Sequence, residues 1–440
     1  MKKILSILSV FLILSMNIVV FADTEYNSAN RITEDTNIDS VIYKSSIPGQ
    51  NALLVEDGNS IINSISLNKM GDYSEDKNGI NSGILVSNGT LSINGGIIKT
   101  DGKYSNAVVS NETGIININN TSINTSEDNS NGIMAYEGNI TTNNVNVNTT
   151  NNYSCAIKSD KAGKIRVDSG TYKTNGAYSP VIYATSDITI NNAILESKHS
   201  EGIIVNGSSV TLSNAKLIDN HDIIDGKYKD YKNIYLFSDE ISEIPKFNAN
   251  DSEIITNNGY TFYTDTNAQI NLINNKFINN NDQFLKIVSK ELDDDVNVIL
   301  NLNNQKLDGN IEVDNSSLNI SLINNSVYRG AINSNESKNI VLKLDLTSKI
   351  ILTNDIYIND LINEVSNNSN IYLNGYNLYV NGNQIDGNKE TYKDSVVDIV
   401  TNYETDNSTN YPILIVVIIL SIIIVLISIV LIKKNRERFM

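Results

Sequence analysis

Three charged side chains alternate along one short segment, at Lys164, Arg166 and Asp168. If the segment is a strand, all three lie on the same face, because successive side chains of a strand alternate between its two faces. A polysaccharide lyase needs such groups, since a cation neutralises the uronate and a Lys or Arg base removes a proton. Asp187, expected one repeat further on, would lie beside Lys164. The alternative is an exposed ladder of charges between neighbouring strands, and we favour it because opposite charges commonly pair across sheet surfaces.

Other groups that could do chemistry are scattered along the chain. Asp293, Asp294 and Asp295 form the longest acidic run, and no glycine-bearing loop pattern surrounds them. A calcium site would need roughly six to eight oxygen ligands from several segments. The two histidines, His199 and His221, lie in separate polar segments, which argues against a histidine-based metal or triad site. We therefore predict no catalytic motif, no metal site and no cofactor.

Tyrosine is plentiful, with 22 residues, and tryptophan is absent. Outward tyrosines beside Asn and Thr can stack on sugars or peptides and can hydrogen-bond to them. Tyr228, Tyr231 and Tyr235 fall close together in an irregular segment, 219–258, and insertions in repeat proteins often lie on the binding face. This segment is the better candidate for a binding patch. We weigh it against an ordinary packed loop, which we favour.

A repeated pattern between Gly83 and Asn220 must position these residues. Each copy has an aliphatic-x-aliphatic segment, then Asn with a small partner, then an apolar residue four positions after that Asn. Successive Asn-type positions are 25, 24, 25, 23 and 22 residues apart, a spacing typical of a solenoid built from one repeated unit. The copies begin at Leu91, Ile116, Ile140, Ile165, Ile188 and Val210, and their Asn-type positions are Asn94, Asn119, Asn143, Asp168, Asn191 and Ser213.

Within each copy the periodicity is that of strands, with aliphatic residues on one face and polar residues on the other. In the first clear unit we expect strands at 90–93, 96–100 and 107–110. Three short strands in one repeat predict an all-β fold, a right-handed parallel β-helix, in which each strand pairs with its equivalent one turn away. A leucine-rich repeat is excluded because the spaced leucines and the helical segment are missing.

The Asn at the first bend of each copy has two expected roles. It tolerates the left-handed backbone of a sharp turn, and its amide can hydrogen-bond to the equivalent amide one coil away. Asp168 and Ser213 depart from the pattern, so we expect this ladder to be interrupted there. Tyr172 and Tyr328 occupy the apolar position after the bend and are predicted to be core residues.

The pattern continues with looser spacing to about Val380, which gives roughly ten coils. Within 219–258 we expect one further coil around 234–237 and 254–255, and an inserted loop in the remainder. The residues 23–50 are predicted to cover the amino-terminal end of the solenoid, because open strand edges invite aggregation. The β-helix itself is assigned to 51–385.

Composition favours a folded domain, with 40% hydrophobic and 19% charged residues. The formal net charge is −17, and six of the basic side chains lie in the two ends of the chain. Such a surface repels phosphate backbones, so nucleic acid is excluded as a partner. Cys155 is the single cysteine, so no intrachain disulfide can form. We predict that it is a small buried structural residue.

The amino-terminal end predicts export. Lys2 and Lys3 precede an apolar run, 4–21, which ends at the small residue Ala22. We expect a secretory signal peptide, 1–22, that is cleaved after Ala22. An uncleaved signal anchor is the alternative.

The carboxy-terminal end predicts a membrane anchor. The segment 413–432 consists of Ile, Leu and Val apart from Ser421 and Ser428, and as a helix it would cross about 30 Å of hydrocarbon. The basic tail that follows, 433–440, should remain cytoplasmic. The polar segment 386–412 is expected to be a stalk. The chain is therefore predicted to be a single-pass protein of the cell membrane with an extracellular β-helix.

Six segments carry a resemblance to a known family, namely Ala52–Gly58, Gly83–Gly89, Ser154–Asp160, Ser179–Ala184, Tyr328–Asn333 and Ile371–Val380. They resemble exported, adhesin-like β-helix proteins of Gram-positive bacteria with the pectin-lyase-like fold. The resemblance extends over about 51–380 and implies the fold. It assigns no catalytic residue, because no motif of the pectinolytic enzymes is present.

Two classes of function follow from these observations. The first is a cell-surface protein with adhesin-like binding of extracellular glycans or other surface ligands. The second is a membrane-tethered polysaccharide lyase or glycoside hydrolase, and a purely structural surface protein is a further alternative. We favour binding, because the solenoid is anchored and acidic and carries no strong catalytic motif.

Overall fold

The computed structural model describes residues 26–75, 79–221, 231–240, 243–289, 296–335 and 337–392. The chain divides into two units, 1–396 and 397–440, and all of the second lies outside the described residues. The predicted signal peptide, membrane span and cytoplasmic tail, most of the stalk, and the Asp293–Asp295 run also lie outside them. In the part of the chain that the structure describes, no helix is long and apolar enough to cross a membrane.

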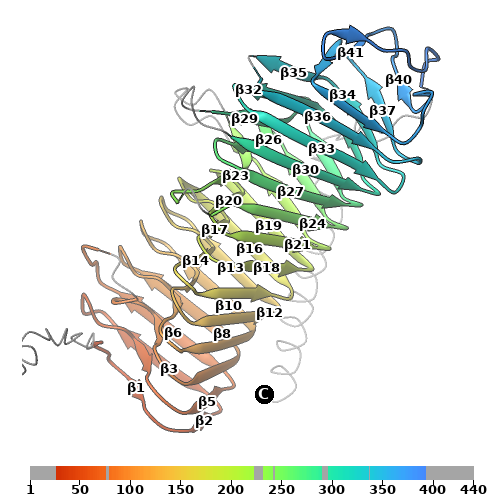
Figure 1. Ribbon diagram of the computed structural model, residues 1–440. Coiled ribbons are helices and arrows are strands. Elements are labelled where there is room, and N and C mark those ends of the chain that lie inside the picture. Colours follow the sequence, from red (N-terminus) through yellow and green to blue (C-terminus); the bar gives the residue numbers. More distant parts are fainter. Residues whose placement is uncertain are drawn as a thin grey trace, which may run out of the picture. The chain divides into compact units, whose positions relative to one another are not determined.

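One side of the solenoid is a parallel sheet of 13 strands, and its strands lie side by side in sequence order (Figure 1). Most of these strands are short, and the middle residue of each points away from the core. The strands are β1 Arg31–Ile32, β4 Leu53–Val55, β7 Ile84–Val86, β9 Val108–Ser110, β11 Ile133–Ala135, β14 Ile157–Ser159, β17 Ile182–Ala184, β20 Ile203–Asn206, β23 Lys232–Phe237, β26 Tyr260–Thr264, β29 Gln283–Val288, β32 Asn310–Asp314 and β35 Ile332–Asn335.

The other sides are formed by a larger parallel sheet that bends around the core. Most coils contribute two strands to it, and in β8 and β10 the two run on as one. Its strands are β2 Thr36–Ile38, β3 Val41–Ser45, β5 Asn59–Ile62, β6 Ile65–Met70, β8 Thr90–Asp101, β10 Ile115–Thr125, β12 Asn139–Asn143, β13 Val145–Thr149, β15 Lys164–Val167, β16 Gly170–Ala177, β18 Ile188–Asn191, β19 Ala193–His199, β21 Ser209–Ser213, β22 Lys216–Asp219, β24 Lys246–Asn250, β25 Glu253–Thr256, β27 Ala268–Ile273, β28 Lys276–Asn279, β30 Asn297–Asn303, β33 Ser317–Ile323, β36 Asn339–Leu344 and β39 Asp360–Asn363.

Two small sheets belong to the last coils. One contains β31 Lys306–Asp308, β34 Val327–Gly330, β37 Lys349–Leu352 and β40 Ile371–Tyr372, and the other contains β38 Ile356–Ile358, β41 Leu378–Val380 and β42 Asn383–Gln384. The pairing of β41 with β42 is antiparallel, unlike the other strand pairs of the described residues. This hairpin therefore closes the last strand edge, which a further coil would otherwise need to cover.

The predicted register is confirmed. Leu91 aligns with Ile116, which aligns with Ile140, and the later copies follow in the same way. The structure is an all-β parallel solenoid of the right-handed type, as predicted. It has about 14 turns rather than roughly ten. The estimate was low in part because the first turn, β1 to β3, lies in the segment 23–50 that was expected to be a cap.

Two neighbouring residues form the bend of a coil. The sequence prediction had assigned both the left-handed backbone and the amide ladder to the first of them. The left-handed backbone belongs to the second residue of the pair, as at Asn120 (φ 51°) and Asn144 (φ 52°). The first Asn forms the predicted ladder, in which Asn119 Nδ2 donates to Asn94 Oδ1 at 3.1 Å. The left-handed residues form contacts of the same kind, because Asn144 Nδ2 donates to Asn120 Oδ1 at 2.7 Å.

The ladder is interrupted on one side of Asp168 and of Ser213, as expected, but it continues on their other side. Asn191 donates to the Asp168 carboxylate at 3.1 Å, and the Ser213 hydroxyl donates to Asn250 at 2.8 Å. A carboxylate accepts and cannot donate. Asn143 therefore accepts from the hydroxyl of Ser169 at 2.9 Å, one residue along, and the chain of polar contacts continues.

The inward positions form one continuous aliphatic core, and the predicted core residues belong to it. Tyr172 and Tyr328 are fully buried, and Cys155 is buried as expected. The further coil predicted within 219–258 is present as β23, β24 and β25. Residues of the expected cap region 23–50 form β1, β2 and β3, which pair with β4, β5 and β6, so the solenoid begins inside that region.

Candidate functional site: an aromatic groove

The charged segment predicted from the sequence lies on β15, in the larger sheet. Lys164 and Arg166 are exposed and Asp168 is half-buried, whereas Ile165 and Val167 between them are buried, so the three charged side chains share the outward face. The Arg166 guanidinium forms an ion pair of 2.6 Å with Asp168 on the same strand segment. Its positive charge is therefore partly neutralised by its own neighbour.

Asp187 lies beside Lys164, as the register predicted, because Ile165 pairs with Ile188. Both line a depression of about 410 Å³ together with Arg166 and Thr189. The arrangement fits the exposed charge ladder that we favoured. A binding role for Lys164, Arg166 and Asp168 stays a prediction.

The three candidate tyrosines have different positions. Tyr228 lies outside the described residues. Tyr231 is half-buried beside the ring of His221, at 4.7 Å between centroids. Tyr235 is in β23, on the outward face of the 13-stranded sheet. The structure therefore does not bring Tyr235 together with the charged segment of β15, because the two belong to different sheets.

Tyr235 belongs to a groove of about 670 Å³ that crosses β14, β17, β20 and β23. Figure 1 shows these four strands as neighbours, and at the spacing of paired strands they extend for about 15 Å along the solenoid. We call it the aromatic groove. It is lined by Tyr104, Asn129, Asn131, Tyr153, Cys155, Lys158, Asp160, Tyr178, Pro180, Tyr183, Thr185, Glu201, Ile204, Asn206, Tyr235, Phe237 and Asp239.

The floor of the aromatic groove consists of the middle residues of its four strands. Lys158, Tyr183, Ile204 and Tyr235 are aligned by the strand register and point outward, because the residues before and after them point into the core. The rings of Tyr235 and Phe237 are stacked, with centroids 4.8 Å apart. The floor therefore carries the aromatic rings of Tyr183 and Tyr235, with the aliphatic side chain of Ile204 between them along the solenoid axis.

One wall of the aromatic groove is made by loops that precede the strands. Tyr104, Asn129, Tyr153 and Tyr178 occupy equivalent loop positions, and all four have left-handed backbones, with φ between 54° and 57°. The rings of Tyr153 and Tyr178 are parallel within 7° at 5.1 Å, and the two side chains are 55% and 47% exposed. A left-handed tyrosine is strained, and such strain is concentrated at ligand clamps. This wall is thus a candidate contact surface for a ligand.

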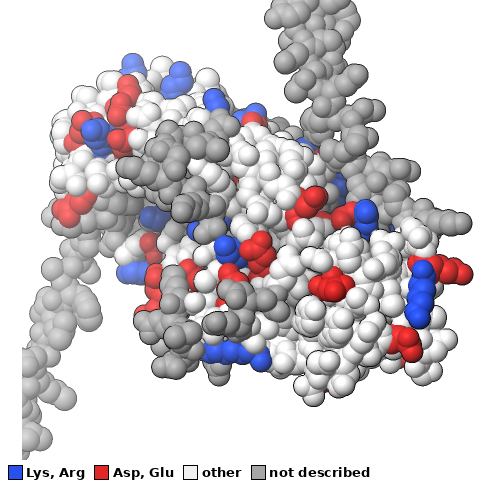
Figure 2. Space-filling model, turned by 90° about the horizontal axis from the view of Figure 1, so that it is seen from above, with Lys and Arg blue, Asp and Glu red and all other residues white. Residues whose placement is uncertain are grey.

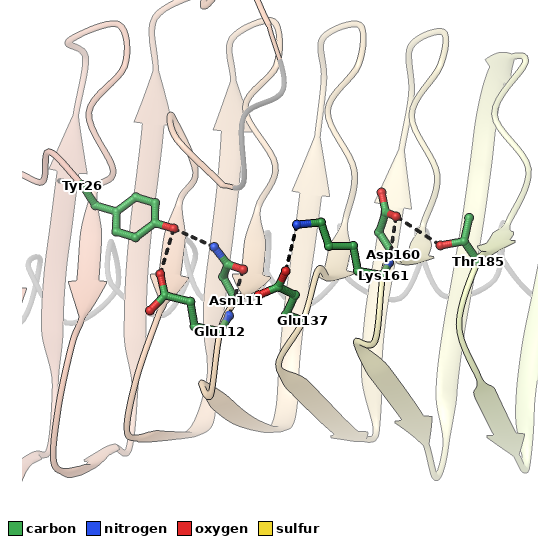
Figure 3. A network of polar contacts seen from close by, with 7 residues as sticks. All are labelled: Tyr26, Asn111, Glu112, Glu137, Asp160, Lys161 and Thr185. Atoms are coloured by element: carbon green, nitrogen blue, oxygen red, sulfur yellow. Dashed lines mark hydrogen bonds and ion pairs between the residues drawn. The ribbon is translucent and has the colours of Figure 1, made fainter. Parts of the chain in front are cut away.

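The opposite edge of the aromatic groove is polar. Figure 3 shows a row of contacts along this edge, which continues over several coils beyond the groove. The Asp160 carboxylate accepts hydrogen bonds from the Lys161 amide at 2.8 Å and from the Thr185 hydroxyl at 3.2 Å. Lys161 is in turn ion-paired with Glu137 at 2.8 Å. These contacts hold the edge side chains in place without filling the groove.

The groove ends where the amino-terminal segment covers the same face of the sheet. Tyr26 belongs to one buried cluster with the outward residues Leu54, Leu85, Val109 and Met134, and Ile80 packs against the same cluster. The Tyr26 hydroxyl accepts from Asn111 at 2.6 Å and donates to Glu112 at 3.3 Å (Figure 3). Burial, and then Glu112, raise the pKa of Tyr26 to about 12. The 13-stranded sheet is therefore covered over its first coils and open from β14 onward.

The phenols of the floor are hydrogen-bond donors at neutral pH. Burial, and then the hydrogen bond of 2.7 Å to Asp265, raise the pKa of Tyr235 far above its usual range. Burial also raises the pKa of Tyr183, and it raises that of the Cys155 thiol to about 12. Cys155 is thus a protonated part of the wall rather than a nucleophile.

Sequence reasoning found Tyr235 but missed most of the aromatic groove. A signal was present: positions 104, 129, 153 and 178 are 25, 24 and 25 residues apart, so the three loop tyrosines recur at the repeat spacing. Tyr183 also lies between the inward residues Ile182 and Ala184, which marks it as outward. Among the described residues, no group of three or more His, Cys, Asp or Glu side chains is placed to hold a metal ion.

Comparison with known proteins identifies no family for this chain. No protein-family model matches the chain, and no curated protein matches it. The function is therefore inferred from the fold and from the aromatic groove.

Proposed function

We propose that this chain is a cell-surface binding protein that recognises extracellular glycans through the aromatic groove. The observation that carries the proposal is the row of outward rings in the groove, with Tyr183 and Tyr235 on its floor and Tyr153 and Tyr178 in its wall. Aromatic rings offer an apolar face and a polar hydroxyl together, which suits a ligand that is apolar on one face and rich in hydroxyls at its edges. Pockets of this volume are typical of ligand sites.

An elongated ligand fits the groove better than a compact one. The floor residues follow the solenoid axis from one coil to the next, and the edge supplies one polar side chain at each of three coils, from Asp160, Thr185 and Asn206. A glycan chain lying along the axis would contact a new floor residue at each coil. This arrangement supports a linear polysaccharide or oligosaccharide more than a single sugar.

The rest of the sequence prediction is part of the same proposal. The signal peptide 1–22 and the span 413–432 would place the β-helix outside the cell on a single carboxy-terminal anchor. The resemblance to adhesin-like proteins of Gram-positive bacteria, and the sequence of the two ends, support this location. The lyase or hydrolase alternative has weaker support, because the Arg166 guanidinium that it requires is already paired with Asp168.

The proposal is tested by binding of the purified full-length chain to an array of glycans, followed by titration of the best ligand. The double variant Tyr183→Ala/Tyr235→Ala should lower affinity by about tenfold or more, since aromatic side chains at the centre of a binding site commonly contribute more than 1 kcal/mol. The matched control is Tyr357→Ala/Tyr379→Ala. This pair is also stacked, at 4.6 Å, but belongs to the small sheet of β38 and β41.

Two results would contradict the proposal. The chain could bind none of a broad set of glycans, or the control pair could reduce binding as much as the groove pair. If Arg166→Ala abolishes binding while Tyr183→Ala/Tyr235→Ala does not, the site lies on β15 and the aromatic groove is not the binding surface.

A further inference from the structure

The charges around the aromatic groove are unequal. Three carboxylates line it, those of Asp160, Glu201 and Asp239, against the ammonium group of Lys158 and that of Lys232, which lies over the ring of the lining residue Tyr235, a formal balance of −1. Each carboxylate accepts a hydrogen bond from a neutral donor: the Thr185 hydroxyl for Asp160, the Ser200 hydroxyl at 2.9 Å for Glu201, and the Asn206 amide at 2.7 Å for Asp239. A neutral donor orients a carboxylate without cancelling its charge.

The aromatic rings of the groove also favour a cationic ligand. The face of a tyrosine ring attracts cations, and ammonium groups are bound in proteins by aromatic rings beside carboxylates. This chain uses the same contact internally, because Lys232 Nζ lies 4.0 Å from the ring centroid of Tyr235 and 4.6 Å from that of Tyr263. Tyr153 and Tyr178 present further ring surface to the groove, close to half exposed.

From these carboxylates and rings, we propose that the aromatic groove selects a polymer of amino sugars with free amino groups. It disfavours uronate chains. The inference rests on the proposed glycan-binding function and specifies its ligand class. Ammonium groups of the sugar would lie near Glu201 and Asp239, while the ring of Tyr183 and the edge of the Tyr235 ring contact the sugar. A uronate chain would place carboxylates against the same acidic edge.

The net negative charge of the whole chain makes a charge-matched control variant necessary. The chain has a formal charge of −17, so any polycation is attracted to some extent. On the face that Figure 2 shows, acidic and basic side chains are interspersed over a larger uncharged surface. Selectivity must therefore be shown to depend on the groove carboxylates and not on the net charge alone.

The experiment titrates the full-length chain with three hexasaccharides in physiological salt: glucosamine, N-acetylglucosamine and galacturonate. Acetylation removes the charge of the amino group while the sugar ring stays the same. We expect glucosamine hexamer to bind at least about fivefold more tightly than N-acetylglucosamine hexamer, and galacturonate hexamer to bind most weakly. Glu201→Gln/Asp239→Asn should remove the preference for glucosamine, measured as the ratio of the glucosamine affinity to the N-acetylglucosamine affinity of the same protein.

The control variant Asp360→Asn/Glu364→Gln removes two exposed carboxylates outside the groove, at β39 and just after it, with the same change in net charge. It should leave the preference for glucosamine intact. If the control reduces the preference equally, or if galacturonate binds as tightly as glucosamine, the inference is wrong. Tighter binding of hexalysine than of glucosamine hexamer would assign the groove to cationic peptides instead.

The outcomes also separate this inference from the proposed function. Binding of N-acetylglucosamine hexamer that depends on Tyr183 and Tyr235, without preference for glucosamine, would leave glycan binding standing and overturn the amino-sugar assignment. Failure of all three hexasaccharides and of the wider array would overturn both.

Discussion

At the residue scale, Lys69 is a charged group inside the solenoid. Its side chain is fully buried, and its ammonium group donates to the carbonyl of Ile47 at 3.3 Å and to that of Met70. Burial lowers the pKa of Lys69 from its ordinary value of 10.5 to about 8. Between these two pH values the unfolded chain holds a proton that the folded chain has lost. Folding stability contributed by this group therefore rises with pH through that window.

Comparison with Lys69→Met isolates this contribution. Between pH 8 and 10.5 the wild type should gain on the order of 2 kcal/mol of unfolding free energy relative to Lys69→Met, measured by denaturant titration at each pH. The comparison also removes the effect of tyrosines that titrate at high pH, because they are present in both proteins. A constant difference between the two proteins across this range would show that the pKa of Lys69 is not lowered.

Thr142 and Tyr172 form a second residue-scale test, inside the repeats. Their hydroxyl oxygens lie 2.6 Å apart in a fully buried position. Thr142→Val should cost about 1–3 kcal/mol because it leaves the Tyr172 hydroxyl buried without this partner, and Tyr172→Phe should cost a similar amount. The double variant should be more stable than the sum of the two losses predicts. Native-state hydrogen exchange of β12 and β16 measures these changes, and strict additivity would contradict the pairing.

At the scale of elements, the left-handed tyrosines in the loop wall of the aromatic groove lower folding stability, and they provide contact surface for a ligand. Tyr104 has a φ of 55°, and the equivalent residue of the next coil, Asn129, has a φ of 57°. Asparagine tolerates this conformation better than tyrosine. Tyr104→Asn should therefore raise stability by about 1 kcal/mol or less while weakening glycan binding severalfold. The reverse variant, Asn129→Tyr, should lower stability, and a loss of stability in Tyr104→Asn would contradict the strain argument.

The same elements explain why the solenoid could be predicted and the groove could not. Leu91, Ile116 and Ile140 repeat at a constant spacing, and that spacing alone aligns them one coil apart. Whether the outward face of a strand is open depends on distant segments. Leu54 and Tyr183 are equivalent outward residues, yet Leu54 is fully buried in the cluster that contains Tyr26, whereas Tyr183 lines the aromatic groove. No local pattern carries that difference, because it arises where the amino-terminal segment folds over the sheet.

At the scale of the whole molecule, each coil contacts mainly its neighbours, so the chain should tolerate the loss of one complete repeat. Thr141 pairs with Arg166, and Ile140 with Ile165. Deletion of the 25 residues 141–165 joins Ile140 to Arg166 and keeps every later side chain on its proper face. Deletion of the 24 residues 141–164 joins Ile140 to Ile165, so two residues with inward side chains become consecutive and the following strand is shifted by one position.

We expect the 25-residue deletion to remain a cooperatively folded β-solenoid with a moderately lower thermal midpoint. The 24-residue deletion should be much less stable, because it must either expose aliphatic side chains of β15 or form a bulge in the middle of the larger sheet. Circular dichroism melting and hydrogen exchange on both proteins measure the difference. Equal stability of the two deletions would mean that side-chain register does not specify the stacking of the coils. The 25-residue deletion also removes Tyr153, Lys158 and Asp160, so its glycan affinity should fall although its fold is kept.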